Sequence, residues 1–206
     1  GTARSGRADA EAQARSADYP ASWSRFGRWK DKRFEATGFF RTHHDGRRWW
    51  LVDPDGCAFV SAGMDCVGAN VAGTTRGQED LFAWLPQGAG RFADAVNDRG
   101  VDFLRANLIR VYGEDWKAGW SRLTAPLLKQ AGFNTVANWS DIAFARASKM
   151  PYVLPMRGFP RTAIRLYRDF PDVFSEEYAE SARRFARQLE DYKDDPYLIG
   201  YFLSNE

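Results

Sequence analysis

The sequence predicts an α/β fold in which short buried strands alternate with amphipathic helices. Residues 115–131 and 175–192 carry apolar side chains at spacings of three and four, the period of a helix with one buried face. Short apolar runs at 133–137 and 198–203 follow these helices, and runs of this length are typical of strands buried in a parallel sheet. A helix followed by a short strand, repeated along the chain, indicates strand-helix-strand units.

Four such strands are expected, and they end near Asp65, Asn138, Pro155 and Glu206. Right-handed crossovers place consecutive parallel strands side by side, with their carboxyl ends at one edge. Four strands are half of a (β/α)8, or TIM, barrel, which typically takes roughly 250 residues. Residues 58–206 are therefore expected to form the first half of such a barrel, as the front part of a longer enzyme.

A β-hairpin ribbon is expected ahead of the barrel, in residues 19–57. Asp45-Gly46 separates two strand-like segments, and Asp55-Gly56 marks a second turn, because glycine tolerates the positive φ that tight hairpin turns require. A strand over 57–65 is expected to follow. Residues 1–18 are rich in Ala, Arg, Gly and Ser without an apolar period, and they are expected to form a flexible leader.

The composition argues against several classes of partner. The chain has 29 basic and 27 acidic residues, a balance that does not indicate a nucleic-acid groove. Its apolar runs fall short of the ~20 residues that cross a bilayer, so no membrane partner is expected. Cys57 and Cys66 are too few for a disulfide framework and are expected to be buried free thiols. The histidines lack partners at ligand spacing, so neither a metal nor another cofactor is expected.

The end of the last strand carries the most specific chemistry, because Asn205 and Glu206 follow it directly. Cleavage of a glycosidic bond needs a carboxylic acid beside the leaving oxygen, and Glu206 is the candidate for this role. Asn205 is placed to bind a sugar hydroxyl. The alternative is a strand end that simply becomes polar.

Further candidates for substrate binding follow the other expected strands. Asn138, Trp139 and Asp141 offer a ring for the C–H face of a sugar and polar groups for its hydroxyls. The alternative is a packed loop in which Asp141 caps a helix at 142–147. Asp65 and Arg157 are expected to project at the same edge, although Arg157 could equally be a surface side chain.

Four segments resemble the β-agarase-like glycoside hydrolases of family 50 and their clan A relatives. They are GMDCVG at 63–68, DFLRANL at 102–108, GFNTVANWSD at 132–141 and DPYLIGYFLSNE at 195–206. The resemblance covers residues 38–206 and implies a (β/α)8 barrel that retains anomeric configuration. It also implies that Glu206, following Asn205, is the acid/base at the end of the fourth strand. The nucleophile of this family is a second Glu after the seventh strand, which this chain lacks.

The expected function is therefore that of a retaining glycoside hydrolase on a β-linked galactose-containing polysaccharide, secreted or periplasmic. Residues 1–206 alone are expected to be inactive, and a carboxyl-terminal half or a second chain is expected to complete the barrel. Two alternatives remain. One is a non-catalytic carbohydrate-binding half-barrel that assembles with another chain, and the other is an α/β domain of unrelated function.

Overall fold

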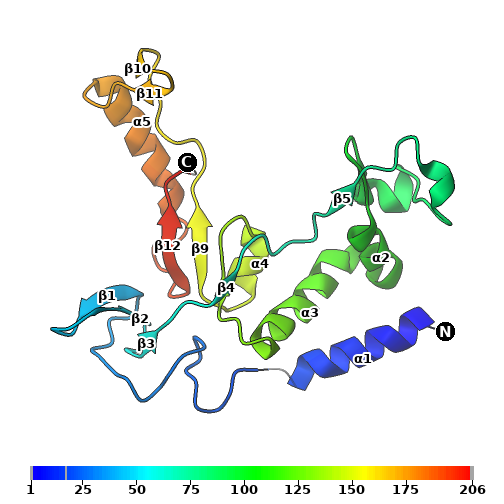
Figure 1. Ribbon diagram of the computed structural model, residues 1–206, viewed down its shortest axis with the longest axis horizontal. Helices are drawn as coiled ribbons and strands as arrows, with labels where there is room; N and C mark the ends of the chain where they lie inside the picture. The colour runs from blue at the N-terminus through cyan, green and yellow to red at the C-terminus, as the bar shows by residue number, and fades with distance from the viewer. Residues whose placement is uncertain (1, 17, 205–206) are drawn as a thin grey trace.

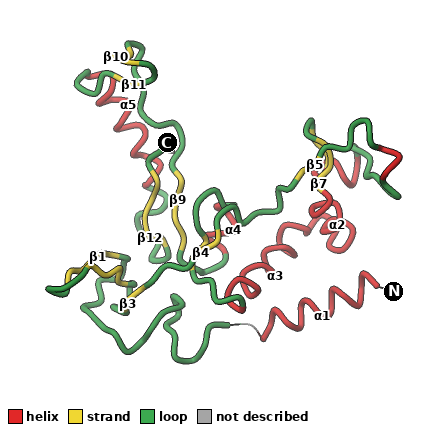
Figure 2. Tube along the Cα trace, in the orientation of Figure 1, coloured by secondary structure: helices red, strands yellow, loops and turns green. Residues whose placement is uncertain are grey.

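A computed structural model describes residues 2–16 and 18–204. Its elements extend in several directions from a small central sheet (Figure 1). One direction holds the antiparallel ribbon, another holds helices α1 to α3, and α5 rises beyond the carboxyl ends of the strands. Long loops connect these parts (Figure 2). Among the described residues, no helix is both long and apolar enough to cross a membrane.

The central sheet has four parallel strands in the order β12-β9-β8-β4. These strands are β4 (Gly63–Met64), β8 (Thr135–Val136), β9 (Tyr152–Pro155) and β12 (Leu198–Phe202). Their order in space follows their order in the chain, as right-handed crossovers require. The α/β fold is thus confirmed, and the carboxyl ends of the four strands share one edge.

Four helices form where the apolar periodicity predicts them. They are α2 (Phe103–Tyr112), α3 (Trp116–Gln130), α4 (Ile142–Ala147) and α5 (Glu176–Ala186). Two of these, α3 and α4, pack against the parallel sheet. Trp120 of α3 and Phe144 of α4 lie in the main core with Val136 and Tyr152 of the sheet. The Trp120 and Phe144 rings are 4.8 Å apart between centroids. Gly132, at φ +83°, lets the chain leave α3 and turn into β8.

The ribbon consists of β1 (Arg41–His44), β2 (Trp49–Val52) and β3 (Ala58–Phe59), paired antiparallel in this order. Asp45 organises its first turn by accepting hydrogen bonds from the backbone N–H groups of Arg47 and Arg48. The expected strand at 57–65 is in fact two strands, because β3 pairs with the ribbon and β4 with the parallel sheet. Residues 60–62 pass the chain from one sheet to the other.

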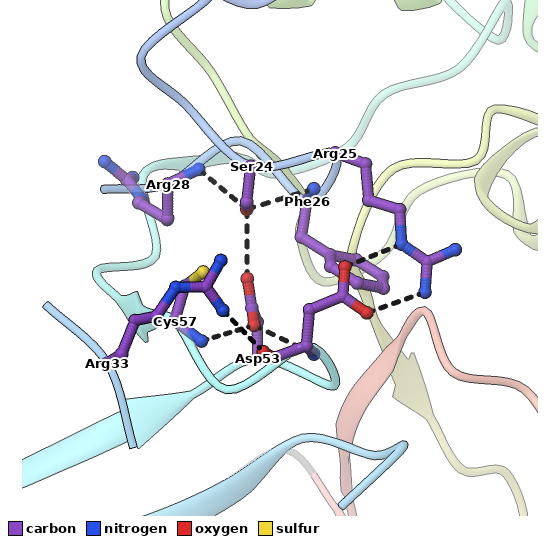
Figure 3. Close-up of polar contacts among 8 residues, drawn as sticks. Ser24, Arg25, Phe26, Arg28, Arg33, Asp53 and Cys57 are labelled. Atoms are coloured by element: carbon purple, nitrogen blue, oxygen red, sulfur yellow. Dashed lines mark hydrogen bonds and ion pairs between the residues drawn. The ribbon is translucent and has the colours of Figure 1, made fainter. Parts of the chain in front are cut away.

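A buried carboxylate fixes the second turn of the ribbon to the segment before it (Figure 3). Asp53 is fully buried and accepts hydrogen bonds from Ser24 Oγ at 2.9 Å and from the N–H groups of Asp55 and Cys57. Burial raises the pKa of Asp53, although these hydrogen bonds oppose the shift. Arg25 adds a two-pronged contact to the Asp55 carboxylate, at 2.8 and 2.9 Å.

A buried amide joins the ribbon region to the parallel sheet. Asn134 Oδ1 accepts from the Ala62 N–H at 2.8 Å, and its Nδ2 donates to the carbonyls of Gly27 and Val60 at 3.0 and 3.2 Å. Asn134 itself is completely buried, just before β8. One side chain therefore satisfies three backbone groups from two separate segments, at Gly27 and at 60–62.

The remaining elements are short. A three-stranded sheet is formed by β5 (Ala72–Gly73), β6 (Val96–Asn97) and β7 (Gly100–Asp102). A hairpin before α5 is formed by β10 (Arg165–Tyr167) and β11 (Phe170–Pro171). Four 3-10 turns lie at Glu79–Leu81, Gly90–Ala95, Gly113–Asp115 and Arg187–Leu189.

Three features differ from the sequence expectation. The expected leader contains a helix, α1 (Thr2–Ser16), which contacts α3. Strand β12 was expected to be fully buried, but Tyr201 and Phe202 are half exposed because β12 is an edge strand. Cys57 is buried as expected, whereas Cys66 is exposed, since it follows β4 in the loop at the carboxyl edge.

Candidate functional site

The candidate site lies at the carboxyl edge of the parallel sheet, where two loop segments meet. Residues 66–71 follow β4, and residues 138–141 follow β8. The Cys66 N–H donates to the Asn138 carbonyl at 2.9 Å, and the Asp141 N–H donates to the Val67 carbonyl at the same distance. Ser140 Oγ accepts from the Val67 N–H at 3.0 Å. These three bonds make the two segments one unit.

Both segments contain a non-glycine residue in the left-handed region. Cys66 and Trp139 each have φ 57°. This conformation is costly for a bulky side chain, by about 1 kcal/mol or more, and it persists where the surroundings impose it. The Trp139 side chain remains 54% exposed. Its ring is therefore presented to solvent by a backbone that the neighbouring segment holds in place.

A cleft of about 900 Å³ opens beside this unit. Its lining combines three indole side chains with several charged groups. The lining side chains that matter here are Trp116, Trp120, Trp139, Asp94, Arg105, Lys117, Asp141 and Arg157. A second cavity, of about 560 Å³, is lined by Lys117, Asp141 and Arg157 as well, and extends toward the carboxyl end of α5. Aromatic faces beside polar groups suit a sugar ligand.

Asp141 is the amino-terminal cap of α4, as the structural alternative predicted. Its Oδ1 accepts from the Phe144 N–H at 2.9 Å, and its Oδ2 lies 3.0 Å from Lys117 Nζ. Partial burial acts to raise the pKa of Asp141, but the hydrogen bond and the ammonium group outweigh it and hold the pKa below its ordinary value. Asp141 is thus an ionised cap that positions Lys117 in the cleft, and it is poorly suited to donate a proton.

Asn138 occupies the buried side of the same segment. It is 8% exposed, and its side-chain Oδ1 has no hydrogen-bond partner within the described part of the chain. Buried amide oxygens are usually paired. Asn138 therefore retains an acceptor at the carboxyl edge that a ligand hydroxyl could fill.

Asp65 and Arg157 follow β4 and β9 at this edge. Asp65 is exposed but is not among the residues that line the larger cleft. Arg157 is also exposed, and it lines both cavities. Gln188 holds the Arg157 backbone from both sides, by accepting from its N–H at 3.1 Å and donating to its carbonyl at 2.9 Å. Of these two residues, only Arg157 joins the cleft.

The expected catalytic residue Glu206 and its neighbour Asn205 lie outside the described residues. Strand β12 runs parallel to β9 up to Phe202, so the chain leaves the sheet at the edge that carries Asn138 and Trp139. In the described ranges, no group of three His, Cys, Asp or Glu side chains is placed to hold a metal ion.

Sequence reasoning missed the residues that α2 and α3 contribute to the cleft, above all Arg105 and Lys117. The signal for Arg105 was an Asp-x-x-Arg spacing at the start of a helix, which pairs a capping carboxylate with a cation one turn later. Lys117 is the second residue of α3, but its partner Asp141 is distant in sequence. Periodicity alone does not reveal such a pair.

No family model matches the chain, but it is similar to known agarases in sequence and in structure. The chain is 28% identical to β-agarase B of Vibrio sp. (strain JT0107), over 88% of this chain and 23% of that protein. It superposes on the structure of PfGH50B with a TM-score of 0.79 at 26% identity, over 100% of this chain and 35% of that one. The agarase AgWH50C gives the same TM-score and identity, over 99% of this chain and 34% of that one.

The chain thus spans less than a quarter of the length of this curated relative and about a third of these structures. The resemblance found in the sequence motifs is confirmed. In sequence and in fold, this chain is similar to the β-agarase-like glycoside hydrolases of family 50.

Proposed function

We propose that this chain forms the acid/base half of a retaining glycoside hydrolase that acts on a β-linked galactose-containing polysaccharide. The observation that carries the proposal is the shared carboxyl edge of four parallel strands, where an exposed Trp139 borders a large cleft. Catalytic residues of (β/α)8 enzymes lie at this edge. The substrate class rests on the similarity to agarases.

The proposed barrel needs further strands on both sides of the sheet. β4 and β12 are edge strands, and the apolar residues Met64, Tyr201, Phe202 and Leu203 are 40–51% exposed. Uncovered strand edges and apolar surface favour pairing with additional strands. A carboxyl-terminal half or a second chain would cover them and supply the second carboxylate.

In the proposed mechanism, Glu206 protonates the glycosidic oxygen and then activates water as a general base. A charged nucleophile nearby would keep the pKa of Glu206 high, and the pKa would fall once the sugar esterifies that nucleophile. The two carboxylates of a retaining enzyme stand roughly 5–5.5 Å apart. Asn205 would bind the hydroxyl next to the reacting carbon, and Trp139 would stack on a sugar face.

The proposed site of action is outside the cytoplasm, because a galactan is too large to cross a membrane intact. The proposal includes no cofactor, since glycoside hydrolysis of this type needs only the two carboxylates and water.

The test uses the complete enzyme that contains residues 1–206. Glu206→Ala should abolish polysaccharide hydrolysis, while an activated aryl galactoside, which needs no acid assistance, still forms the covalent intermediate. Azide should then restore turnover and yield a galactosyl azide of retained configuration. The matched control is Glu190→Ala, which removes an exposed carboxylate that forms an ion pair with Lys193.

Near-normal hydrolysis by the Glu206→Ala variant would refute the catalytic assignment, and an inverted product from the parent would refute retention. Tight binding of agarose oligosaccharides without hydrolysis would support the carbohydrate-binding alternative instead.

A further inference from the structure

We propose that Arg105 is a positioning residue that sets the glycan affinity of the cleft by clamping the loop after β4. The inference rests on the proposed function for its ligand class. Arg105 belongs to the 102–108 motif, for which neither the sequence reasoning nor the proposed mechanism has a role.

The guanidinium of Arg105 donates to backbone carbonyls of two different segments, the loop after β4 and the 3-10 turn at Gly90–Ala95. Its Nε and Nη2 donate to the Ala69 carbonyl at 3.2 and 2.6 Å, and its Nη1 donates to the Asp94 carbonyl at 2.7 Å. The cation also lies 5.1 Å from the centroid of the Trp116 ring. One side chain on α2 therefore connects both segments to an indole that lines the cleft.

Asp102 completes the clamp from the start of the same helix. Its Oδ1 caps α2 by accepting from the Arg105 N–H, and its Oδ2 accepts from the Val71 N–H, both at 2.9 Å. Asp102 is almost fully buried, and its Oδ2 lies 3.7 Å from Arg105 Nε. Asp102 and Arg105 thus hold the loop by hydrogen bonds to the backbone of Val71 and Ala69.

The other end of this loop is fixed to the segment that bears Trp139. Val67 exchanges hydrogen bonds with Ser140 and Asp141, as described above. Residues 67–71 are therefore held at one end by the β8 loop and at the other by Asp102 and Arg105. Releasing the Arg105 end frees residues 69–71, which line the same cleft as Trp139, and the cost of ordering them again would weaken ligand binding.

Arg105 acts through this loop, because Nε, Nη1 and Nη2 each have a protein partner. Arg91 provides a matched control from the neighbouring excursion. Its Nη2 donates to the carbonyls of Ile109 and Arg110 at 2.8 and 3.1 Å, and its cation lies 5.4 Å from the centroid of the Phe92 ring. Arg91 does not line the larger cleft.

The experiment takes as its parent the complete enzyme with Glu206→Ala, so that the ligand is not hydrolysed. It compares this parent with variants that also carry Arg105→Ala, Arg105→Lys or Arg91→Ala. Calorimetry measures the affinity for an agarose-derived hexasaccharide, and hydrogen exchange with mass spectrometry reports on peptides that cover 66–72 and 138–141. Arg105→Ala should weaken affinity about tenfold or more and speed exchange in 66–72. Arg105→Lys keeps the charge but cannot donate to Ala69 from two nitrogens, so it should lose nearly as much. Millimolar guanidinium should partly restore affinity to Arg105→Ala, whereas equimolar NaCl should not.

Arg91→Ala should stay within twofold of the parent in affinity. Should Arg105→Ala fail to fold, Asp102→Asn tests the same clamp, because its amide cannot accept from both Val71 and Arg105. The inference is overturned if the parent binds and the Arg105 variants match Arg91→Ala, or if exchange in 66–72 is unchanged. A parent that binds no hexasaccharide refutes the proposed function, and the exchange data then decide the clamp separately.

Discussion

Removing the side-chain amide of Asn134 should cost more stability than any substitution of an exposed polar residue in this protein. Asn134→Ala deletes an acceptor for the Ala62 N–H and two donors, to the Gly27 and Val60 carbonyls. Val60 is itself exposed, so water can reach that part of the chain. The Ala62 N–H and the Gly27 carbonyl are the groups left without a partner.

Each buried polar group that loses its partner costs about 1–3 kcal/mol. Two such groups predict a loss of about 2–6 kcal/mol in the free energy of unfolding, a large part of the stability of a typical domain. Asn134→Asp should not recover this loss. Its carboxylate can still accept from Ala62, but it faces the Gly27 and Val60 carbonyls without a proton to donate.

The measurement is urea-induced unfolding followed by tryptophan fluorescence, which the eight Trp of the chain make sensitive. Asn107→Ala is the control, because Asn107 is exposed and its Oδ1 accepts a long hydrogen bond, of 3.3 Å, from the exposed Arg110. The reasoning is refuted if Asn134→Ala lowers the free energy of unfolding by less than about 1 kcal/mol while the slope of this free energy against urea concentration stays unchanged. The ribbon and the sheet would then not depend on this amide.

Three further outcomes are expected. Burial raises the pKa of Asp53 above its ordinary 3.8, so the folded state binds this proton more tightly than the unfolded state does. Protonation of Asp53 therefore stabilises the fold at low pH, and this stabilisation is lost as the pH rises through the raised pKa. The free energy of unfolding of the parent, minus that of Asp53→Asn, should therefore be larger at pH 3.5 than at pH 7; the opposite slope in urea titrations would contradict the raised pKa. Cys66 is exposed and Cys57 buried, so a thiol reagent should label one cysteine in the native protein and two in guanidinium, and two native labels would exclude this packing. Trp139→Gly should relieve the left-handed strain and leave stability equal or higher by about 1 kcal/mol, yet weaken hexasaccharide affinity; unchanged affinity would remove Trp139 from the site.

The parts of the fold that sequence predicted are those with a strong local period. Residues 142–147 form α4 as expected, and α3 differs by one residue at each end, because apolar spacing and terminal residues define both helices. The strand at 57–65 was misjudged because composition does not show to which sheet a strand pairs. β3 pairs with β2 and β4 pairs with β8, and the second of these partners is distant in sequence.

The site was predictable to a smaller degree. Trp139 and Arg157 both line the cleft, and residues that follow parallel strands gather at one end of a sheet. Asp141 turned out to be a helix cap, an alternative that sequence also allowed. Arg105 contacts Ala69, 36 positions away, and Lys117 contacts Asp141, 24 positions away. Contacts between residues so far apart cannot be predicted from the periodicity of the sequence.

Residues 60–62, which connect β3 to β4, also affect where a protease would cleave the chain. Val60 and Ser61 are exposed. The backbone of this connection is nevertheless held by Asn134, which accepts from the Ala62 N–H and donates to the Ala62 carbonyl, and proteases need a locally unfolded stretch. The excursion at 74–85 is exposed and largely irregular, and it contains Arg76. Trypsin should therefore nick the native chain first near Arg76. The two fragments would remain associated, because β4 on one side of the nick pairs with β8 on the other.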